Sequence, residues 1–410
     1  MPYSKMENRS PRISVRNNRR PRYSFFRWSE LAEETWMIRN SMRTLPGFLQ
    51  PFLSWLTAKP LPEDLNQVRT LKPIHHILVS TGLIASGVVL AGVGYLHGSV
   101  IVWGLGFVLA TGGIKQMQVM ICHNCAHEMV FEQRETNVTV GRIISGVLML
   151  KPFDTYKREH ALHHSSKTLL TDDDDTLSYL QGVVGLTPSD SVTRMWTKLV
   201  CTALSPLAIL RSFWGRVKGT ATASNRRVAV LTLIFWATAS LLAAALGHFG
   251  LFVMAWVVPV FAGYHISTTF RLAAEHTWPS VEVLERRGID FICESTTGVF
   301  IGEELRIPQA AGAVRRTACI SVWLIKMLGF HLFIRVFVMV GDTPCHDFHH
   351  RRPRSKEWPN YITARERDRI DGSKPFPTNY ADYWGYINAV TVNFRNFQNA
   401  LPYYTNRTET

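Results

Sequence analysis

The sequence predicts an all-α integral membrane protein with four transmembrane helices arranged as two hairpins. Two long uncharged stretches support this fold class, because no Lys, Arg, Asp or Glu occurs in 73–114 or in 228–270. A membrane-spanning helix needs about 20 mainly apolar residues, so each stretch is long enough for two helices and a tight connection. The composition agrees, since 46% of the residues are apolar and only 19% are charged.

Each uncharged stretch is interrupted near its middle by small and polar residues, which predicts turns near 95–99 and 247–250. Neither turn contains Lys or Arg, whereas all 45 of these residues lie in the other segments. Positive-inside bias therefore predicts that both termini and the segment between the hairpins are cytoplasmic. Two buried hairpins of a soluble protein are the alternative, but soluble helices seldom run this far without a polar face.

Two further apolar runs contain charges and are interpreted differently. The run 196–214 includes Lys198 and Arg211, and the run 322–340 includes Lys326 and Arg335. Charges at such positions suit helices that lie at the membrane interface or pack in a cytoplasmic cap. A fifth transmembrane helix at 322–340 is the competing interpretation, and it would put the segment after it on the opposite side of the membrane.

The formal charge of +14 is compatible with an anionic membrane surface or with nucleic acid. No zinc-finger spacing or RNA-binding aromatic motif occurs, and the basic residues are scattered rather than set on one helical face. We therefore expect no nucleic-acid partner. The six cysteines are too sparse for a disulfide scaffold, and no signal peptide precedes the basic N-terminal segment, so a reducing compartment is expected.

Nine of the fifteen histidines, all in the segments predicted to be cytoplasmic, are candidate metal ligands: eight occur in clusters at spacings typical of metal ligands, and a ninth is placed to join them. The motif CHNCAH follows the second predicted span, HALHH and HDFHH lie on either side of the second hairpin, and one histidine follows the fourth span. The nine are His123, His127, His160, His163, His164, His276, His346, His349 and His350. Imidazole is a favoured ligand for iron, zinc, copper and nickel, and two ions with mostly nitrogen ligands need about eight to ten donors. The pattern therefore predicts a dimetal site.

Other polar residues are expected to pack, to face solvent or to orient the histidines rather than to bind metal. The remaining six histidines are expected to be interfacial or packed, namely His75, His76, His97, His248, His265 and His331. Cys122 and Cys125 are expected to pack in the core, and the acidic run 172–175 to form a solvated loop, with an approach to the metals as its alternative. Four carboxylates are candidates for accepting an imidazole N–H and fixing its tautomer: Glu128, Glu159, Glu275 and Asp342.

The order of the boxes, HxxxH, HxxHH and HxxHH, together with the two hairpins, resembles the membrane fatty acid desaturases and their hydroxylase relatives. The resemblance extends over roughly 70–360 and includes the acidic run after the second box. It implies that the nine histidines bind two iron ions, which cycle between Fe2+ and Fe3+, and that molecular oxygen is a co-substrate. Leu272 stands where acyl-CoA desaturases usually have asparagine, and Glu275-His276 is more similar to bacterial desaturases and membrane alkane hydroxylases.

The resemblance implies oxygen-dependent oxidation of an unactivated C–H bond in an acyl or alkyl chain, with fatty acid or lipid desaturation favoured. Hydroxylation by the same centre is the alternative, and a zinc hydrolase or a metal transporter is less favoured. The acyl or alkyl chain of the substrate would enter an apolar tunnel from the bilayer. No haem, flavin or iron–sulfur motif is visible, so an external electron donor, a ferredoxin or cytochrome-type protein with its reductase, is expected.

These expectations divide the chain into three parts. Residues 1–72 form a basic cytoplasmic segment with interfacial helices, 73–360 form the membrane catalytic domain, and 361–410 form a cytoplasmic C-terminal tail. The hairpins occupy about 73–114 and 228–270 of the catalytic domain. The dimetal site is expected in a helical cap on the cytoplasmic face.

Overall fold

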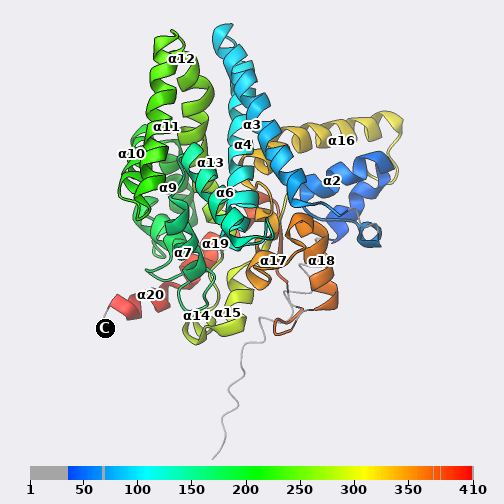
Figure 1. Cartoon of the computed structure of the whole chain (residues 1–410). Helices are drawn as coiled ribbons and strands as arrows, with labels where there is room; N and C mark the ends of the chain where they lie inside the picture. The colour runs from blue at the N-terminus through cyan, green and yellow to red at the C-terminus, as the bar shows by residue number, and fades with distance from the viewer. Residues whose placement is uncertain (1–35, 67–69, 373, 379, 409–410) are drawn as a thin grey trace, which may run out of the picture.

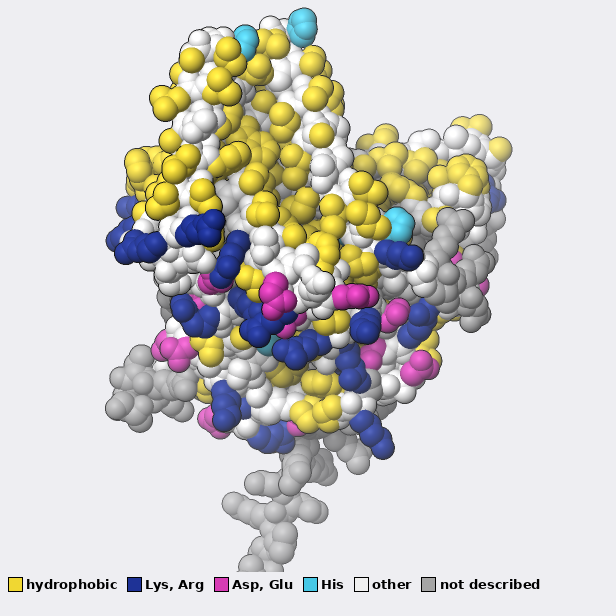
Figure 2. Space-filling view, in the orientation of Figure 1, with side chains coloured by type: hydrophobic (Ala, Val, Ile, Leu, Met, Phe, Trp, Pro, Cys, Tyr) yellow, Lys and Arg dark blue, Asp and Glu magenta, His cyan; other side chains and the backbone are white. Residues whose placement is uncertain are grey.

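The computed structural model describes residues 36–66, 70–372, 374–378 and 380–408. About half of the basic N-terminal segment, residues 1–35, lies outside the described residues. Helices account for most of the structure, and the long apolar helices project from a broader body that holds the shorter ones (Figure 1). Figure 2 shows that hydrophobic side chains cover the projecting part, whereas Lys and Arg side chains appear where it joins the body.

The first uncharged stretch forms two helices joined by a short turn. Helix α3 (Pro73–Leu96) turns at the expected position into α4 (Val100–Gln116). A π-helical turn (Met117–Cys122) then joins α4 to α5 (His123–Ala126), so that one continuous helix leads from the turn to the first histidine. Such turns within helices often occur at functional sites.

The second uncharged stretch also forms helical segments joined by a short turn. Helix α11 (Arg226–Ala245) turns into α12 (Phe249–Phe252), and two π-helical turns (Val253–Val257 and Pro259–Gly263) lead into α13 (Tyr264–Glu275). Pro259 has no N–H group for a regular helical hydrogen bond, which favours an altered hydrogen-bond pattern at this point. Helix α13 ends directly before His276, the predicted metal ligand that follows the fourth span.

Within the described residues, five helical segments are long and apolar enough to cross a membrane, and the fifth is 313–338. It consists of α16 (Ala313–Lys326) and two following π-helical turns (Met327–His331 and Ile334–Val338). Figure 1 shows α16 running across the direction of α3 and α4 rather than alongside them. By length and composition there are thus five candidate spans among the described residues. The direction of α16 distinguishes the fifth from the other four.

The apolar run 196–214 differs from the single interfacial helix that was expected. It is divided between α9 (Val192–Leu204) and α10 (Pro206–Ala221). Ser205 separates them, and its side chain accepts a hydrogen bond from the N–H of Ala208 at the start of α10. Proline favours the first position of a helix and disfavours helical geometry in the residue before it, so Pro206 explains the break.

The shorter helices surround the histidine segments and fill the body. They are α2 (Gln50–Thr57), α6 (Arg134–Val147), α7 (Phe153–His163), α8 (Asp175–Ser178), α14 (Val281–Arg286), α15 (Gly288–Ser295), α17 (His346–Arg351), α18 (Tyr361–Asp371), α19 (Tyr386–Asn399) and α20 (Leu401–Thr408). The largest hydrophobic cluster joins residues from α9, α13 and α19 with Phe337 and Val338. The C-terminal helix α19 is therefore part of the main core.

The fold is mostly helical, as predicted, but it also contains one small parallel sheet that the all-α prediction lacked. Strand β1 (Gly298–Phe300) pairs with β2 (Asp382–Trp384), with Gly298 opposite Asp382 and Phe300 opposite Trp384. Each strand has only three residues, too few to show an alternating pattern in the sequence. The pairing attaches the C-terminal segment to the part of the chain that follows α15.

A buried ion network lies next to this sheet. Lys59 Nζ lies 2.8 Å from a carboxylate oxygen of Glu366 and 3.1 Å from one of Asp382. The guanidinium of Arg365 contacts Asp347 at 2.5 Å and Asp382 at 2.6 Å, and all five side chains are almost fully buried. Asp347 follows His346 directly. The network therefore connects the third histidine box to Lys59 near the N-terminus and to Asp382 near the C-terminus.

Candidate metal centre

Four separate helical segments bring all nine predicted histidines together. His123 lies on α5 and His127 caps its end, His160 and His163 lie on α7, and His164 caps that helix. His276 follows α13, and the remaining three lie on α17. The ring nitrogens form two groups, in each of which the atoms lie within 4.8 Å of one another. The groups are His123, His127, His160, His164 and His349, and His163, His276, His346 and His350.

The Nε2 atoms of the five-histidine group face one another at short distances. His123 lies 2.7 Å from His349 and 3.1 Å from His160. His127 lies 2.9 Å from His160, and His164 lies 3.1 Å from His160 and 3.0 Å from His349. In the four-histidine group, His276 lies 3.0 Å from His163, and His350 lies 3.1 Å from His346.

These distances fit metal coordination better than hydrogen bonding. A neutral imidazole carries one ring proton, so a nitrogen with several imidazole nitrogens around it cannot form a hydrogen bond with each. Metal–imidazole bonds of about 2.1 Å at right angles place neighbouring nitrogen atoms about 3.0 Å apart. The observed range of 2.7–3.1 Å agrees with that spacing. The donor set therefore suits two ions that accept nitrogen ligands.

Two histidines of the second group have hydrogen-bond partners on the ring nitrogen that faces away from the group. His163 Nδ1 lies 2.8 Å from Asp174 Oδ1, and His276 Nδ1 lies 3.3 Å from the carbonyl oxygen of Ser295. A proton held on Nδ1 leaves Nε2 free to bind a metal. The Nδ1 atoms of His164 and His350 are buried and have no partner among the described residues.

Asp174 is the site residue that sequence reasoning missed. The acidic run is partly a solvated loop, as expected, since its other three carboxylates are exposed, but Asp174 is 1% exposed. Burial opposes its charged form, yet hydrogen bonds from His163 and the N–H of Leu170 hold the pKa of Asp174 below its ordinary value. The alternative that the run approaches the metals therefore applies to Asp174 and Asp175, whose carboxylates form a group with His163.

The four carboxylates predicted to orient imidazoles do not share that role. Glu128 contacts Lys157 at 2.5 Å and Arg134 at 3.0 Å, and Glu159 contacts Lys151 at 2.6 Å. These two predictions are wrong. Glu159 lies on α7, where a residue adjacent to a ligand points about 100° away around the helix. Glu128 lies beyond the end of α5, with φ 64°, and its side chain reaches basic residues instead.

Of the other two carboxylates, Glu275 lies close to a histidine and Asp342 has a different environment. Glu275 Oε1 lies 3.4 Å from His346 Nε2, on the nitrogen that faces the group, and also pairs with Arg271. It therefore approaches the candidate metal position instead of accepting an outward N–H. Asp342 precedes a separate turn (Thr343–Cys345), so it does not share a helical face with His346. Burial raises the pKa of Asp342 to about 7.

The two cysteines of the CHNCAH motif pack as expected. Cys122 and Cys125 are buried in one hydrophobic cluster, and Cys122 Sγ lies 3.5 Å from Ser145 Oγ. Neither cysteine belongs to a metal-binding group among the described residues. Their role in the structure is helix packing below the histidines.

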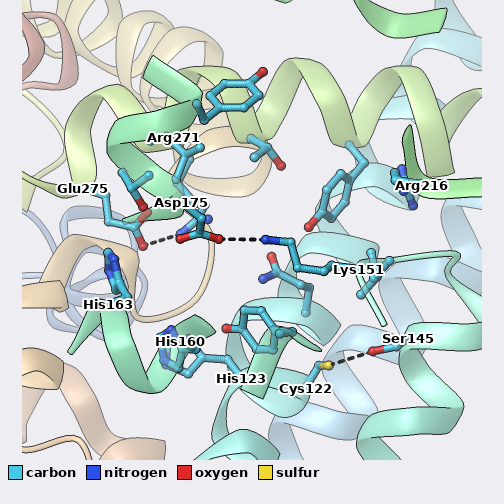
Figure 3. A pocket seen from close by; sticks show the side chains of 18 of the residues that line it. Cys122, His123, Ser145, Lys151, His160, His163, Asp175, Arg216, Arg271 and Glu275 are labelled. Carbon is cyan, nitrogen blue, oxygen red and sulfur yellow. Dashed lines mark hydrogen bonds and ion pairs between the residues drawn. The ribbon is translucent and has the colours of Figure 1, made fainter. Parts of the chain in front are cut away.

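A cavity of about 280 Å³ opens beside the two histidine groups (Figure 3). Its wall includes His123, His160, His163 and His346 together with Glu275. Charged and hydroxyl side chains form much of the remaining wall: Lys151, Tyr156, Asp175, Tyr179, Ser212, Arg216, Tyr264, Thr268 and Arg271. This lining differs from the apolar tunnel that the sequence led us to expect.

Residues 98–304, about half of the chain, match the family model described as fatty acid desaturase. The chain belongs to the fatty acid desaturase family. The matched region contains the first two histidine boxes and His276, while the third box lies beyond it and is brought to the same place by the fold. No curated protein and no solved structure matches the chain. The desaturase family is enzymatic, so the histidine groups and the cavity beside them form the candidate active site of an oxidoreductase.

Proposed function

We propose that this desaturase-family protein holds two iron ions at its nine histidines and uses molecular oxygen to desaturate an acyl or alkyl chain. The observation that supports this most directly is the meeting of nine histidine nitrogens, from four distant segments, in one group of five and one of four. Five and four donors suit two metal ions, whereas a hydrolytic zinc site needs three protein ligands and a water molecule. Metal transporters place their ligands within the spans.

A reduced pair of iron ions supplies, with oxygen, an oxidant strong enough for an unactivated C–H bond. Desaturation removes two hydrogen atoms from neighbouring carbons, and two further electrons and two protons complete the reduction of oxygen to two water molecules. Hydroxylation consumes the same electrons but leaves one oxygen atom on the carbon. The two reactions therefore differ only in the fate of the substrate.

The protein's own residues prepare the site for this chemistry. Asp174 and the Ser295 carbonyl orient His163 and His276, so that their Nε2 atoms face inward. Glu275, held by Arg271, lies at the edge of the four-histidine group and also lines the cavity. It is the described carboxylate in the best position to exchange a proton with a group bound there.

The electrons must come from a separate protein, for which we propose a ferredoxin or cytochrome-type donor with its reductase. The basic side chains beneath the apolar surface in Figure 2 offer an acidic donor an electrostatically favourable approach. Purified protein supplied with substrate, oxygen and a donor chain should turn over repeatedly, at a rate that falls with rising salt. Sustained turnover with a nicotinamide cofactor alone would contradict this proposal.

Metal analysis and lipid mass spectrometry test the main proposal together. We expect about two iron ions per chain, and a loss of metal and activity in His163→Ala and His349→Ala. His248→Ala is the matched control, since His248 lies in the turn before α12. One zinc ion per chain with full activity would refute the diiron proposal. New double bonds in lipids of expressing cells would support desaturation, and new hydroxyl groups would favour the alternative.

A further inference from the structure

We propose that the cavity beside the histidines binds the anionic group of an amphiphile, so that the carbon oxidised lies within a few bonds of that group. The substrate class would be a carboxylate- or phosphate-headed chain attacked near its polar end, not in the middle of a long acyl chain. The oxidation step rests on the proposed function above. The binding step rests on the cavity alone.

The charges of the cavity wall favour an anion. Three cationic side chains line it, Lys151, Arg216 and Arg271, against the carboxylates of Asp175 and Glu275. Asp175 pairs with Lys151, and Glu275 pairs with Arg271. No ion pair involving Arg216 occurs among the described residues. Its guanidinium instead donates to three carbonyl oxygens, those of Leu148, Met149 and Val260.

Further donors face the same space. The Nε atom of Arg271 is buried and has no hydrogen-bond partner among the described residues. Lys115, which is 0% exposed, lies behind the wall, and its Nζ is 3.0 Å from both Gln118 and Thr268, two residues that line the cavity. A partly buried guanidinium that has only neutral acceptors is stabilised when an anion enters its surroundings.

The rest of the wall suits the chain that follows an anionic head. The rings of Tyr156, Tyr179 and Tyr264 and the side chains of Leu150 and Leu272 also line the cavity. Aromatic rings with hydroxyl groups provide apolar contact area as well as hydrogen bonds. The wall therefore offers both of the chemical characters that an amphiphile combines.

The size of the cavity limits the distance between the bound anion and the carbon that is oxidised. Its volume of about 280 Å³ is at the lower end of the roughly 300–1,000 Å³ that ligand sites usually have. Both Arg216 and the histidines belong to the wall of this one small space. An anion at Arg216 therefore leaves room for only a short length of chain before the histidines are reached.

Binding is tested first, on purified protein in nanodiscs with its metal removed, so that the result is independent of oxidation. The probes are dodecanoate and dodecyl phosphate, with dodecanol, dodecyltrimethylammonium and inorganic phosphate as comparisons. We expect the two anionic amphiphiles to raise the thermal midpoint and the other three to leave it unchanged. Equal effects of dodecanol would overturn the anion requirement, and an equal effect of inorganic phosphate would overturn the amphiphile.

Variants then locate the binding site. Arg216→Gln should weaken dodecanoate binding about tenfold, the loss expected for one charged hydrogen-bonding group, and Arg216→Lys should restore part of it. Arg211→Gln on the same helix is the matched control, because Arg211 is exposed and does not line the cavity. Lys151→Gln, which removes another cationic side chain of the cavity wall, provides a second test if Arg216 variants are poorly folded. Unchanged binding in a folded Arg216→Gln or Lys151→Gln protein would place the anion elsewhere.

Product analysis separates this inference from the proposed function. Iron-loaded protein supplied with the bound amphiphile and an electron donor should oxidise carbons near the anionic group. Oxidation beyond the middle of the chain would overturn the inference and leave the proposed function standing. Binding that depends on Arg216, but without any oxidation by iron-loaded protein, would support the anion site and contradict the proposed function.

Discussion

At the scale of single residues, Asp174 is the member of the acidic run that forms a hydrogen bond with a site histidine. Asp174→Asn should lower iron affinity about 10- to 100-fold, as other losses of such partners do, because His163 then loses the carboxylate that holds its Nδ1 proton. The measurement is iron content per chain after dialysis against a chelator. Asp173→Asn is the control, since Asp173 is exposed in the same run. Equal iron retention in both variants would contradict the prediction.

The histidines were predictable from sequence, but their partners were not. Spacing identified eight of them, because i, i+3 and i, i+4 residues share a helical face, and His276 was identified by its position after the fourth predicted span. The partners depend on how loops fold back: Asp174 reaches His163 from beyond the end of α7, and Ser295 reaches His276 from α15. Glu128 was wrongly predicted as a partner because sequence adjacency does not fix which way a side chain points.

At the scale of elements, the first hairpin depends on close contact between α3 and α4. A side chain added at Gly106 would overlap the backbone N and Cα atoms of Ala91, and one added at Gly87 would overlap those of Ala110. Small residues at such positions let transmembrane helices approach closely. We expect Gly106→Val to destabilise the protein by more than about 1–3 kcal/mol, the usual cost of overpacking, because backbone atoms are in the way.

Thermal unfolding of detergent-solubilised protein measures this effect. Gly104→Val is the matched control on the same helix, since nothing lies within 4 Å of a side chain added at Gly104. A similar fall in thermal midpoint for both variants would mean that intrinsic helix preference, not helix contact, causes the loss.

The hairpins were predictable because an uncharged stretch of this length has few alternatives to crossing a bilayer. Other features of the elements depend on local backbone effects or on distant partners. The break before Pro206 was overlooked because hydrophobicity continues across it. The pairing of β1 with β2 joins residues about eighty positions apart, and neither three-residue strand has a pattern of its own.

At the scale of the whole molecule, the buried ion network should make stability sensitive to acid. The pKa of Asp382 is lowered to about 2, chiefly by Arg365 and Lys59 against the opposing effect of burial. A carboxyl with a lowered pKa stabilises the folded state above its unfolded pKa of about 3.9 and loses this contribution as the pH falls towards 2. The shift corresponds to about 2 kcal/mol.

The variant Asp382→Asn should therefore be less stable than the wild type at pH 6, and the difference should shrink as the pH approaches 2. Removing one member also leaves Lys59 and Arg365 with fewer partners, which adds to the loss at neutral pH. Thermal midpoints of both proteins between pH 6 and pH 2.5 provide the comparison. A difference that stays constant over this range would contradict the predicted titration.

The network itself was beyond sequence reasoning. Lys59 and Asp382 are more than three hundred residues apart, and an isolated lysine or aspartate gives no sign of burial. The separation of 361–410 as a tail stays a prediction about domains, although α18 and α19 pack with the rest of the described chain.

The number of membrane crossings follows from the histidines themselves. The rings of His276 and His346 lie with their centroids 5.0 Å apart, so the chain between them begins and ends on the same side of a membrane. One candidate span, 313–338, lies between them, and a single crossing would separate the two rings. We therefore predict four crossings, with α16 at the cytoplasmic interface. In a background that lacks the native Cys201 and Cys319, cysteines placed at Ser99 and at Lys356, which follows the candidate span, test this. An impermeant reagent should label Ser99→Cys only from outside and the exposed Lys356→Cys only from the cytoplasmic side. Labelling of Lys356→Cys from outside would restore the fifth span and contradict the shared position of the two histidines.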